Sequence, residues 1–593
     1  MCGILGQINL VEPINQQVFN TMLDTLAHRG PDGRGIHVNP SATIAFGHRR
    51  LSFLDLTEAG TQPMLNQEGN IWITFNGEIY NYLELRESLK AKYSFKTGTD
   101  TEVLLAAYRT WGIDFVHRLK GMFAFALYDE TQNKLFLVRD RFGIKPLYYY
   151  KHNNGFIFAS ELKAIMASGI VPKEVDFSAF ADYFVYRYIP SPKTIWKQVC
   201  KVPPACFLEI DTKDLSVTET EYYTLPVTDT LAEEGRLIAE VQSILLQSVR
   251  EHTRADVPIG SFLSGGYDSS ALVYLMTRAG QNPSTFSIGF KNWDKSEDQY
   301  AKIVANHLGV NNTAVVADEN SLKYIDIMAA VYDEPIADIS IVPTYLVSKL
   351  ARNEVKAVLS GEGADEAFGG YTWQHEFMKK YHSGKWFTRL FKPNPSVDIV
   401  SFYAQAMAMG WFDAEEFKKM LHPNLHQYIP DDVHWFYRKN VKPQLTPLKS
   451  IQYLDIKCFM GELVLTKIDR ASMANSLEVR VPFLDHHLLE KIFSINESSY
   501  FKPNQTKFLL YKNINMYLPE EILERKKQGF VGPDSYYMDM AFYKSQLADS
   551  VLVKNDIINQ SYLDELFTQS YNWKLWKILI MEKWFSQWID SAN

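Results

Sequence analysis

Apolar and polar positions alternate differently in the two halves of the chain. In the first half, short apolar runs recur between turn-forming residues, and these runs cover residues 71–74, 121–126, 135–140, 148–150 and 155–160. Short runs rich in β-branched and aromatic residues are typical of strands. In the second half, runs of strand length alternate with stretches of helical spacing. The pattern therefore predicts a strand-rich first part and an alternating second part.

The alternation of strand and helix is clearest in the middle of the chain. The run 257–263 predicts a buried strand, and residues 271–276 continue it as a helix. Residues 285–290 predict the next strand, and the apolar residues within 300–308 form one helical stripe. The run 355–359 predicts a further strand. Strands that alternate with helices predict a parallel sheet covered by helices.

A polar loop with two glycines joins the first of these strands to its helix. Gly265 and Gly266 lack a Cβ, so backbone N–H groups can approach an anion closely there. Ser264, Ser269 and Ser270 add hydroxyl donors, and the helix points its positive end at the loop. Such residues are also common in surface turns, but a surface turn does not explain the apolar strand before it. We therefore predict a phosphate-binding loop.

The acidic residue of this loop indicates which kind of phosphate the loop binds. No Lys follows the glycines as in a GxxxxGK[ST] loop, and Asp268 stands where Mg²⁺ would be held. This pattern indicates pyrophosphate rather than a γ-phosphate. The sequence S-G-G-x-D-S resembles the PP-loop of ATP pyrophosphatases, which split ATP into AMP and pyrophosphate while they adenylate a substrate. A second polar loop, 360–366, follows the strand 355–359, so both loops are expected above one sheet edge.

The N-terminus carries a candidate nucleophile. Cys2 becomes the first residue when Met1 is removed, and a small side chain at the second position favours that removal. A terminal cysteine carries nucleophile and base in one residue, because its α-amine, with a reference pKa of about 7.7–8.0, can take the thiol proton through a water. Alone, a cysteine at this position would be incidental, but polar segments with related chemistry follow it.

The segment 75–81 predicts an oxyanion hole. It runs from the strand 71–74 into a helix, so Asn76 and Gly77 are expected at the corner between them. Asn-Gly usually marks a hairpin turn, but the helical pattern that follows disfavours a hairpin. An Asn amide and a glycine N–H at such a corner are donors that stabilise an oxyanion.

Three further polar segments belong with this corner. Residues 26–33 form a turn-rich loop, and residues 47–52 place a basic pair before an apolar strand. Residues 97–102 open a helix with a capping pattern. Asp100 is either a plain helix cap or a carboxylate exposed at the helix start, where it can hold an ammonium group.

Together these segments resemble the glutaminase domain of class II glutamine amidotransferases, and residues 139–148 also match that family's pattern. The resemblance implies an N-terminal nucleophile fold, with two packed sheets between helices, and release of ammonia from glutamine. It makes Cys2 the nucleophile and assigns the oxyanion hole to Asn76 and Gly77. The glutamine-binding residues that it implies are Arg50, Leu51, Ser52, Asn76, Gly77, Glu78 and Asp100.

Composition and charge limit the expected partners. The chain has 593 residues, of which 46% are hydrophobic and 22% charged, and its net charge is −8. These values are typical of a globular protein and argue against binding to nucleic acid or to anionic membranes. Small molecules are the expected partners. No secretory signal or long apolar span is apparent, which predicts a cytoplasmic enzyme. Four cysteines are too few for a disulfide scaffold.

Proline density marks the junction between the two halves. It rises over residues 188–204 and places a domain boundary near residue 210. The prediction is a glutaminase domain at 2–210 with the αββα fold and an α/β synthetase domain at 211–593. Residues 465–485 are dense in charges and suit either a site wall or an interdomain face.

In this order the motifs resemble glutamine-hydrolysing asparagine synthetases of the bacterial B type over nearly the whole chain. The resemblance implies amidation of L-aspartate to L-asparagine with ATP and glutamine, through β-aspartyl-AMP, releasing AMP, pyrophosphate and glutamate. Asp268 and Asp365 would hold Mg²⁺ on pyrophosphate. Glu362 would deprotonate the attacking ammonium, and Lys527 would stabilise charge on the α-phosphate. The ATP-binding residues that it implies are Leu263, Ser264, Gly265, Gly266, Asp268, Ser269, Ile288, Ser360 and Gly361.

The acceptor carries no motif of its own. An amidotransferase of the same build acting on another carboxylate, such as a surface-sugar uronate or a peptide, is the main alternative. β-Lactam synthetases and peptide cyclases share the second domain but usually lack the N-terminal cysteine, so Cys2 counts against them. A catalytically silent regulator would not need an intact thiol. Tyr267 stands where the family commonly has Leu, residues 373–450 match no motif, and a homodimer stays open.

Overall fold

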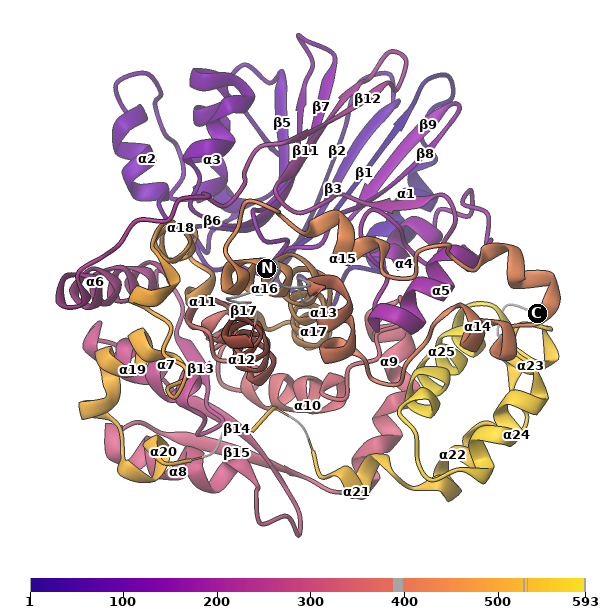
Figure 1. The fold of residues 1–593 in the computed structure, drawn as a ribbon. Helices are drawn as coiled ribbons and strands as arrows, with labels where there is room; N and C mark the ends of the chain where they lie inside the picture. The colour runs from indigo at the N-terminus through magenta and orange to yellow at the C-terminus, as the bar shows by residue number, and fades with distance from the viewer. Residues whose placement is uncertain (1, 388–397, 526–527, 531, 591–593) are drawn as a thin grey trace.

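The computed structural model describes residues 2–387, 398–525, 528–530 and 532–590. Two domains are visible, with the strands of the N-terminal half at the top of Figure 1 and the C-terminal half below them. Within the described residues, no helix combines the length and the apolar character needed to cross a bilayer.

Two six-stranded sheets form the N-terminal domain, and neighbouring strands in both are antiparallel. The first has the strand order β10-β8-β9-β1-β3-β2, and the second has the order β12-β11-β7-β6-β5-β4. The strands of the first sheet are β1 (Gly3–Asn9), β2 (Gly33–Val38), β3 (Ile44–Arg50), β8 (Tyr148–His152), β9 (Gly155–Ala159) and β10 (Val199–Lys201). Those of the second are β4 (Met64–Leu65), β5 (Ile71–Ile79), β6 (Gly121–Asp129), β7 (Lys134–Arg139), β11 (Cys206–Asp211) and β12 (Val217–Glu221).

Apolar side chains from both sheets meet between them. Ile4 and Phe158 of the first sheet share one buried cluster with Trp72 and Leu137 of the second. In a strand, successive side chains point to opposite faces, so each sheet also presents an outer face that helices must cover. The two sheets therefore form the central layers of a four-layer domain.

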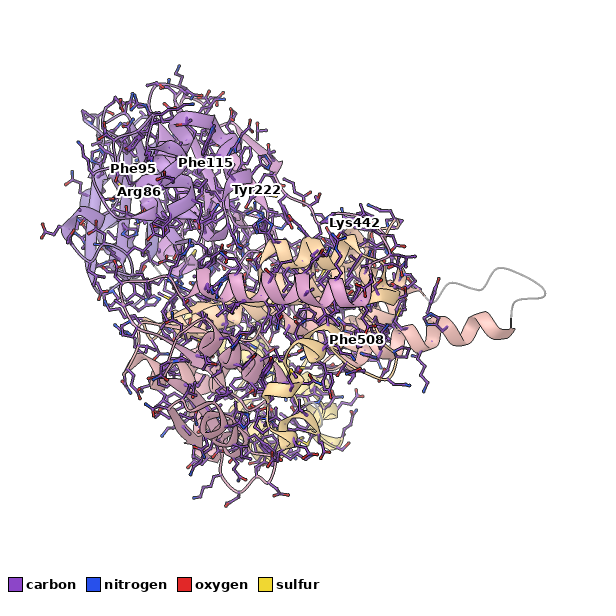
Figure 2. All side chains as sticks on the ribbon, turned by 90° about the vertical axis from the view of Figure 1, so that its left-hand side faces the viewer. Arg86, Phe95, Phe115, Tyr222, Lys442 and Phe508 are labelled. Atoms are coloured by element: carbon purple, nitrogen blue, oxygen red, sulfur yellow. The ribbon has the colours of Figure 1, made fainter. Side chains whose placement is uncertain are left out.

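Helices cover both outer faces of the sheet pair. They are α1 (Gln16–Asp24) and α4 (Leu162–Met166) on the first sheet, and α2 (Tyr82–Leu89) and α3 (Asp100–Trp111) on the second. Figure 2 shows this outer region, where the guanidinium of Arg86 lies 4.4 Å from the ring centre of Phe95 and Phe115 belongs to the apolar cluster under α3. The layer order confirms the predicted N-terminal nucleophile fold.

The structure corrects two local predictions in this domain. Strand β5 does not end at residue 74 but continues through Asn76 and Gly77 to Ile79, because its pairing with β6 continues along all of these residues. A Cβ on Gly77 would lie 2.1 Å from the carbonyl oxygen of Met122, so the close approach of β6 requires glycine there. The basic residues around Arg50 lie in β3 itself rather than before a strand.

The first domain also extends past the boundary near residue 210 that the prolines indicated. Strand β12 pairs with β11 from Cys206↔Glu221 to Ile210↔Val217, which completes the edge of the second sheet. Proline density marked the loops before β10 and β11 rather than the end of the sheet.

The C-terminal domain contains a five-stranded parallel sheet with the order β15-β14-β13-β16-β17. Its strands are β13 (Ile259–Phe262), β14 (Thr285–Phe290), β15 (Asn312–Ala317), β16 (Ala357–Leu359) and β17 (Glu478–Arg480). The helices between them include α7 (Tyr267–Arg278), α8 (Glu297–Leu308) and α10 (Ile341–Arg352). The predicted parallel sheet is confirmed. Strand order reverses between β13 and β16, which is where ligands bind in open sheets of this kind.

Helices make up most of the region that matched no motif. They are α12 (Thr372–Phe387), α13 (Ile399–Met407), α14 (Ala414–Met420), α15 (Trp435–Asn440) and α16 (Pro447–Leu454). A π-helical segment, Asp455–Val464, then leads into α17 (Leu465–Met473), which packs on α10. Helix α25 (Lys574–Trp588) packs on α9 (Ile325–Tyr332) near the end of the described chain.

Candidate functional site

One cavity in the N-terminal domain brings most of the predicted glutamine site together. Its walls include six of the predicted residues, namely Cys2, Arg50, Leu51, Gly77, Glu78 and Asp100. Ser52 does not line it; its amide N donates instead to Asp32 Oδ2 at 2.9 Å. The residues come from β3, β5 and the start of α3, so distant segments of the chain converge on one space.

Asn76 of β5 lies beside the candidate nucleophile Cys2, which directly precedes β1. The amide N of Cys2 donates to Asn76 Oδ1 at 2.9 Å. The Nδ2 of Asn76 is buried and makes no hydrogen bond to any described residue. A buried donor without a partner is costly unless a ligand satisfies it. The orphaned amide is therefore suited to an oxyanion on the substrate.

Burial governs the protonation of the thiol itself. Loss of solvent raises the pKa of Cys2, so the resting side chain is a neutral thiol. Its Sγ lies 4.0 Å from the carbonyl oxygen of Leu51. A neutral thiol needs a base before it can attack a carbonyl carbon.

Two carboxyl groups form the acidic end of the cavity. Burial raises the pKa of Glu78 well above its usual value, against the opposing effect of the Arg480 guanidinium. Burial also raises the pKa of Asp100 to about 6, although the amide N of Ile79 donates to its Oδ2 at 3.0 Å. Two crowded, buried carboxylates favour a cationic ligand, which offsets their repulsion.

The position of Asp100 rules out one of its two interpretations, the plain helix cap. The helix cap is Thr99, whose Oγ1 accepts from the amide N of Glu102 at 3.2 Å. Asp100 is 6% exposed, so it lies in the cavity wall rather than at a solvent-facing helix end.

The cavity wall also includes a basic residue, Arg50. Arg50 donates from Nη1 to the carbonyl of Thr57 at 2.8 Å and from Nη2 to the carbonyl of Asp55 at 2.6 Å. Gln62, which no motif marked, holds the wall in shape: its Nε2 donates to Thr101 Oγ1 at 3.0 Å. A lone glutamine in a loop gives no sequence signal, because its contacts are all to distant residues.

The PP-loop follows β13 as predicted. Ser264 Oγ accepts from the amide N of Gly266 at 3.2 Å and lies 3.0 Å from Ser269 Oγ. Gly265 has φ +67°, and a Cβ there would lie 2.4 Å from the Cβ of Tyr300. Glycine is therefore required for the loop to pack against α8. Helix α7 begins at the end of the loop and directs its N-terminus toward it.

The second loop meets the first above β13 and β16, which confirms the predicted placement. A Cβ on Gly361 would lie 3.2 Å from the Cβ of Asp268. Glu362 has a buried Oε2 that makes no hydrogen bond to any described residue, which leaves it available as a proton acceptor. Ser360 is held by a hydrogen bond from its amide N to the carbonyl of Arg480 at 2.9 Å.

A lysine that no motif marked joins the two predicted magnesium ligands. Lys507 Nζ lies 2.5 Å from Asp268 Oδ1 and 2.9 Å from Asp365 Oδ1. The two carboxylates raise the pKa of its ammonium, although burial opposes this shift. Carboxylate oxygens that already converge on one cation can also hold Mg²⁺, so these residues fit the implied metal.

Other predicted residues lie around the loops or outside the described chain. Leu263 and Ile288 are buried in the core beneath the loops. Arg525, which was not among the predicted site residues, places its guanidinium 4.1 Å from the ring centre of Tyr300. Lys527 lies outside the described residues.

The charged stretch 465–485 contributes to the domain interface, which is one of the two interpretations that the sequence left open. Arg29 of the N-terminal domain donates from Nε to the carbonyl of Cys2 at 3.0 Å and from Nη1 to Asp469 Oδ2 at 2.9 Å. Arg470 approaches Glu161 at 2.9 Å, and both side chains are buried. Buried ion pairs need near-complete compensation, so the domains are docked in a specific register.

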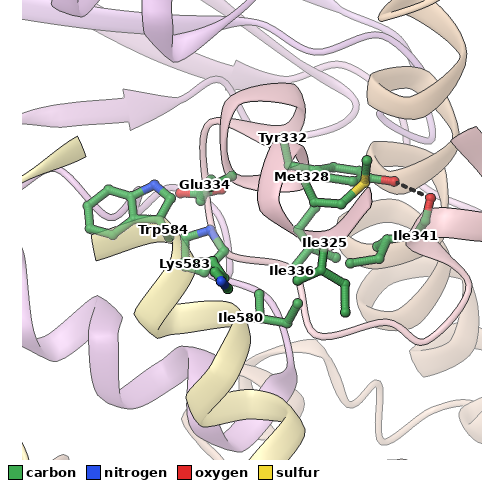
Figure 3. A pocket seen from close by; sticks show the side chains of 11 residues that line it. Ile325, Met328, Tyr332, Glu334, Ile336, Ile341, Ile580, Lys583 and Trp584 are labelled. Atoms are coloured by element: carbon green, nitrogen blue, oxygen red, sulfur yellow. Dashed lines mark hydrogen bonds between the residues drawn. The ribbon is translucent and has the colours of Figure 1, made fainter. Parts of the chain in front are cut away.

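Two further features lie outside these sites. An apolar pocket between α9 and α25 is lined by residues such as Met328 and Ile580, and Tyr332 donates to the carbonyl of Ile341 at 3.4 Å (Figure 3). It contains none of the predicted residues.

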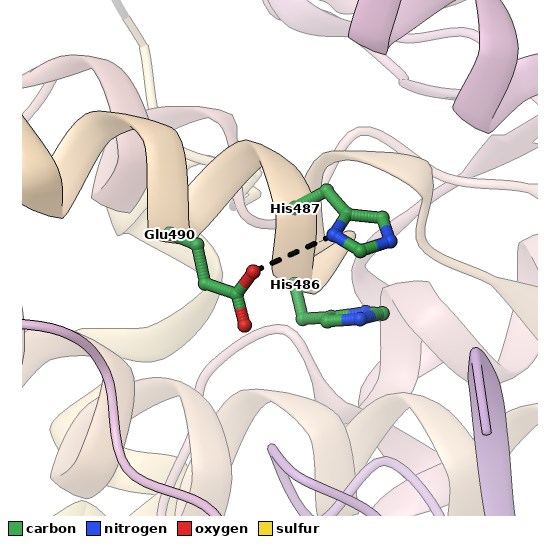
Figure 4. A group of neighbouring side chains, drawn as sticks. All are labelled: His486, His487 and Glu490. Atoms are coloured by element: carbon green, nitrogen blue, oxygen red, sulfur yellow. Dashed lines mark ion pairs between the residues drawn. The ribbon is translucent and has the colours of Figure 1, made fainter. Parts of the chain in front are cut away.

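In the described part of the chain, three side chains of the kinds that bind metal ions lie close together at the start of α18 (His486–Ser494). The group consists of His486, His487 and Glu490, and His487 Nδ1 lies 3.4 Å from Glu490 Oε2 (Figure 4). It includes neither of the carboxylates predicted to hold magnesium.

Comparison with known proteins adds a family assignment to this geometry. A family model described as "Glutamine amidotransferase domain" matches residues 1–223, and one described as "Asparagine synthase" matches residues 240–586. "Asparagine synthetase [glutamine-hydrolyzing] 1" of Bacillus subtilis is 34% identical, over 99% of this chain and 96% of that protein. "Asparagine synthetase [glutamine-hydrolyzing] 3" of the same organism is 31% identical, over 95% and 92%. "Amidase chry2" of Gibberella zeae is 28% identical, over 96% and 94%.

A glutamine amidotransferase domain joined to a nucleotide-binding parallel-sheet domain defines a carbon–nitrogen ligase, in which ATP drives an amidation with nitrogen from glutamine. The chain belongs to the asparagine synthase family.

Proposed function

We propose that the enzyme converts L-aspartate into L-asparagine, with glutamine as the nitrogen donor and β-aspartyl-AMP as the intermediate. One observation carries the proposal. A buried thiol beside an orphaned amide donor, and a PP-loop beside a converging carboxylate pair, occur in one chain whose full length is similar to an asparagine synthetase. Glutamate, AMP and pyrophosphate are the other products. These substrates are cytoplasmic metabolites, so we place the enzyme in the cytoplasm.

The N-terminal site releases ammonia from glutamine. Removal of Met1 frees the α-amine of Cys2, which takes the thiol proton through a water. The thiolate attacks the amide carbon, and the oxyanion is stabilised by Nδ2 of Asn76 and the N–H of Gly77. Arg50 binds the α-carboxylate of glutamine. The α-ammonium of Cys2 gives its proton to the amide nitrogen, so the C–N bond breaks, ammonia leaves and a thioester remains. Water then hydrolyses the thioester to glutamate and restores the thiol.

The α-ammonium of glutamine is the cation that the acidic end of this cavity accommodates. Glu78 and Asp100 are buried together there, and both have raised pKa values in the absence of a ligand. An ammonium group between them favours their ionised forms and so binds most strongly when both are deprotonated.

The C-terminal site turns the acceptor carboxylate into one with a leaving group. An oxygen of the aspartate side chain attacks the α-phosphorus of ATP, and pyrophosphate leaves from the PP-loop. Asp268 and Asp365 would hold Mg²⁺, which supplies positive charge to the phosphates when bound. Glu362 takes the proton from the attacking nitrogen, and AMP then departs. Lys527 stabilises charge on the α-phosphate.

Pyrophosphate release tests the acceptor directly. With ATP, Mg²⁺ and ammonia present, release should depend on L-aspartate and not on L-glutamate, uronates or peptides offered at equal concentration. Release that depends on a different carboxylate would replace aspartate as the acceptor.

That outcome defines the second candidate function, an amidotransferase of the same build acting on another carboxylate. The observation that favours it is the similarity of "Amidase chry2" over 96% of this chain, at 28% identity. The greater identity to the Bacillus subtilis asparagine synthetase over a similar length favours aspartate.

A further inference from the structure

Arg480 belongs to the C-terminal domain, yet its side chain lies against the glutamine cavity of the N-terminal domain. It ends the edge strand β17 and is fully buried. Its Nη2 lies 3.3 Å from Oε1 of Glu78, a residue of the cavity wall. The guanidinium is also 5.4 Å from the ring centre of Phe53, another residue of that wall.

The remaining contacts fix the direction in which the guanidinium points. Nε donates to Glu478 Oε1 at 2.6 Å. Nη1 donates to the carbonyls of His252 and Arg254 at 2.8 and 2.9 Å. Nη2 makes no hydrogen bond to any described residue and is the group aimed at Glu78. A planar guanidinium held on two of its nitrogens keeps the third in a defined place.

This placement gives both carboxyl groups of the cavity a common counter-ion. Burial disfavours the ionised forms of Glu78 and Asp100, and Arg480 favours the ionised form of each. An ammonium ligand requires ionised carboxylates, because a neutral carboxyl offers little attraction to a cation. Removing Arg480 would therefore weaken the binding of a cationic group to Glu78 and Asp100, without changing the thiol or the oxyanion donors.

We propose that Arg480 is a positioning residue of the glutaminase site, supplied by the C-terminal domain, that keeps the Glu78 and Asp100 pair ready for the α-ammonium of glutamine. The inference rests on the proposed glutaminase function. It makes the glutamine site complete only when the two domains are docked.

A purely structural role for Arg480 makes a different prediction. Arg254 provides a matched comparison, because it also belongs to the C-terminal domain and approaches Glu84 of the N-terminal domain at 2.8 Å. Glu84 is 54% exposed at its side chain and does not line the cavity. A variant at Arg254 therefore removes the side chain of an interdomain arginine–glutamate pair, while the backbone carbonyl that accepts from Arg480 stays in place.

The experiment compares Arg480→Met, Arg480→Lys and Arg254→Met with two substrates, glutamine and glutaramate, which is glutamine without its α-amino group. Arg480→Met should lower kcat/KM for glutamine about 10- to 100-fold, mainly through KM, as loss of one charge-assisted contact does. Hydrolysis of glutaramate should change by no more than about twofold, because this substrate has no ammonium group to bind to Glu78 and Asp100. Arg480→Lys should recover part of the loss, and Arg254→Met should leave both substrates within about twofold of the wild type.

Equal losses with both substrates, or equal losses in Arg480→Met and Arg254→Met, would overturn the inference. Ammonia-dependent synthesis reports whether each variant is folded. If Arg480→Met loses ammonia-dependent synthesis, Arg480→Lys takes its place in the test. Because Lys keeps the positive charge, this variant should still lower hydrolysis of glutamine more than hydrolysis of glutaramate. A wild-type enzyme that does not hydrolyse glutamine would contradict the proposed function itself, which is a distinguishable result.

Discussion

The two candidate sites handle their paired carboxylates in opposite ways. In the glutamine cavity, Glu78 and Asp100 have raised pKa values and the nearby guanidinium stands 3.3 Å from Glu78. In the PP-loop site, Asp268 and Asp365 already hold the ammonium of Lys507 between them. In the proposed function the first pair receives a cation with its ligand, whereas the second pair already contacts the Lys507 ammonium. The ionisation of a paired carboxyl group therefore depends on its partner and not on burial alone.

The largest effect that separates the two sites is expected for Cys2→Ala. In the proposed function the thiol acts only in the first site, so glutamine-dependent synthesis should fall by about a thousandfold or more. Ammonia-dependent synthesis should stay near the wild-type rate. Rates measured with each nitrogen source check this, and loss of both activities in a folded variant would contradict the assignment.

The converse separation is expected for Asp268→Asn and Asp365→Asn. Each should lower synthesis about 100-fold or more with either nitrogen source, because fewer anionic ligands remain for Mg²⁺ on pyrophosphate. Glutaminase turnover should be unchanged, and it serves as the internal control. Wild-type ATP cleavage in either variant would place the metal elsewhere.

Lys507→Met tests whether the second pair depends on its built-in cation. Removing the ammonium leaves two carboxylates facing each other, which should lower the free energy of unfolding by about 2 kcal/mol without Mg²⁺. Added Mg²⁺ should raise the Tm of this variant more than that of the wild type. Lys356→Met is the control, since it breaks a partly exposed pair with Asp32. Equal responses to Mg²⁺ would show that the metal does not occupy the lysine position.

The pH dependence of the glutaminase should reveal the first pair. Burial raises the pKa of Asp100 to about 6, and the charged groups that act on it are Glu78 on β5 and Arg480 on β17. Glu478 on β17 acts in turn on Glu78. The ionised carboxylate is the form that binds ammonium, so kcat/KM for glutamine should fall as pH decreases through about 6, by about tenfold per unit below it. Glutaramate hydrolysis should lack this acid limb. An identical limb for both substrates would assign it to another group.

The contrast between the sites also explains what the sequence could predict. The PP-loop is a run of consecutive residues between a strand and a helix, so its chemistry and its place at the sheet edge follow from local patterns. The β13 and β16 loops meet because parallel strands end at the same edge. The strands and helices of that region were predicted closely for the same reason.

The rest depends on contacts between residues far apart in the chain. Pairing with β6 extends β5 through Asn76, which no local pattern at an Asn-Gly pair could indicate. Lys507 is 239 positions from Asp268, and Arg480 acts across the domain interface. A single lysine such as Lys507 carries no signal until the fold places it beside its partners. Arg480 lies in the charged stretch 465–485, but nothing local distinguishes it there from the other charged residues.

The central claim is that one chain takes nitrogen from glutamine at the first site and uses it on an adenylated aspartate at the second. One reaction with amide-¹⁵N glutamine, aspartate labelled with ¹⁸O in its side-chain carboxylate, and ATP tests it most directly. Mass spectrometry should find ¹⁵N in the side-chain amide of asparagine and one ¹⁸O in AMP, because the acyl-adenylate passes a carboxylate oxygen to the nucleotide. Unlabelled AMP, ADP as the nucleotide product, or asparagine without ¹⁵N would contradict the account.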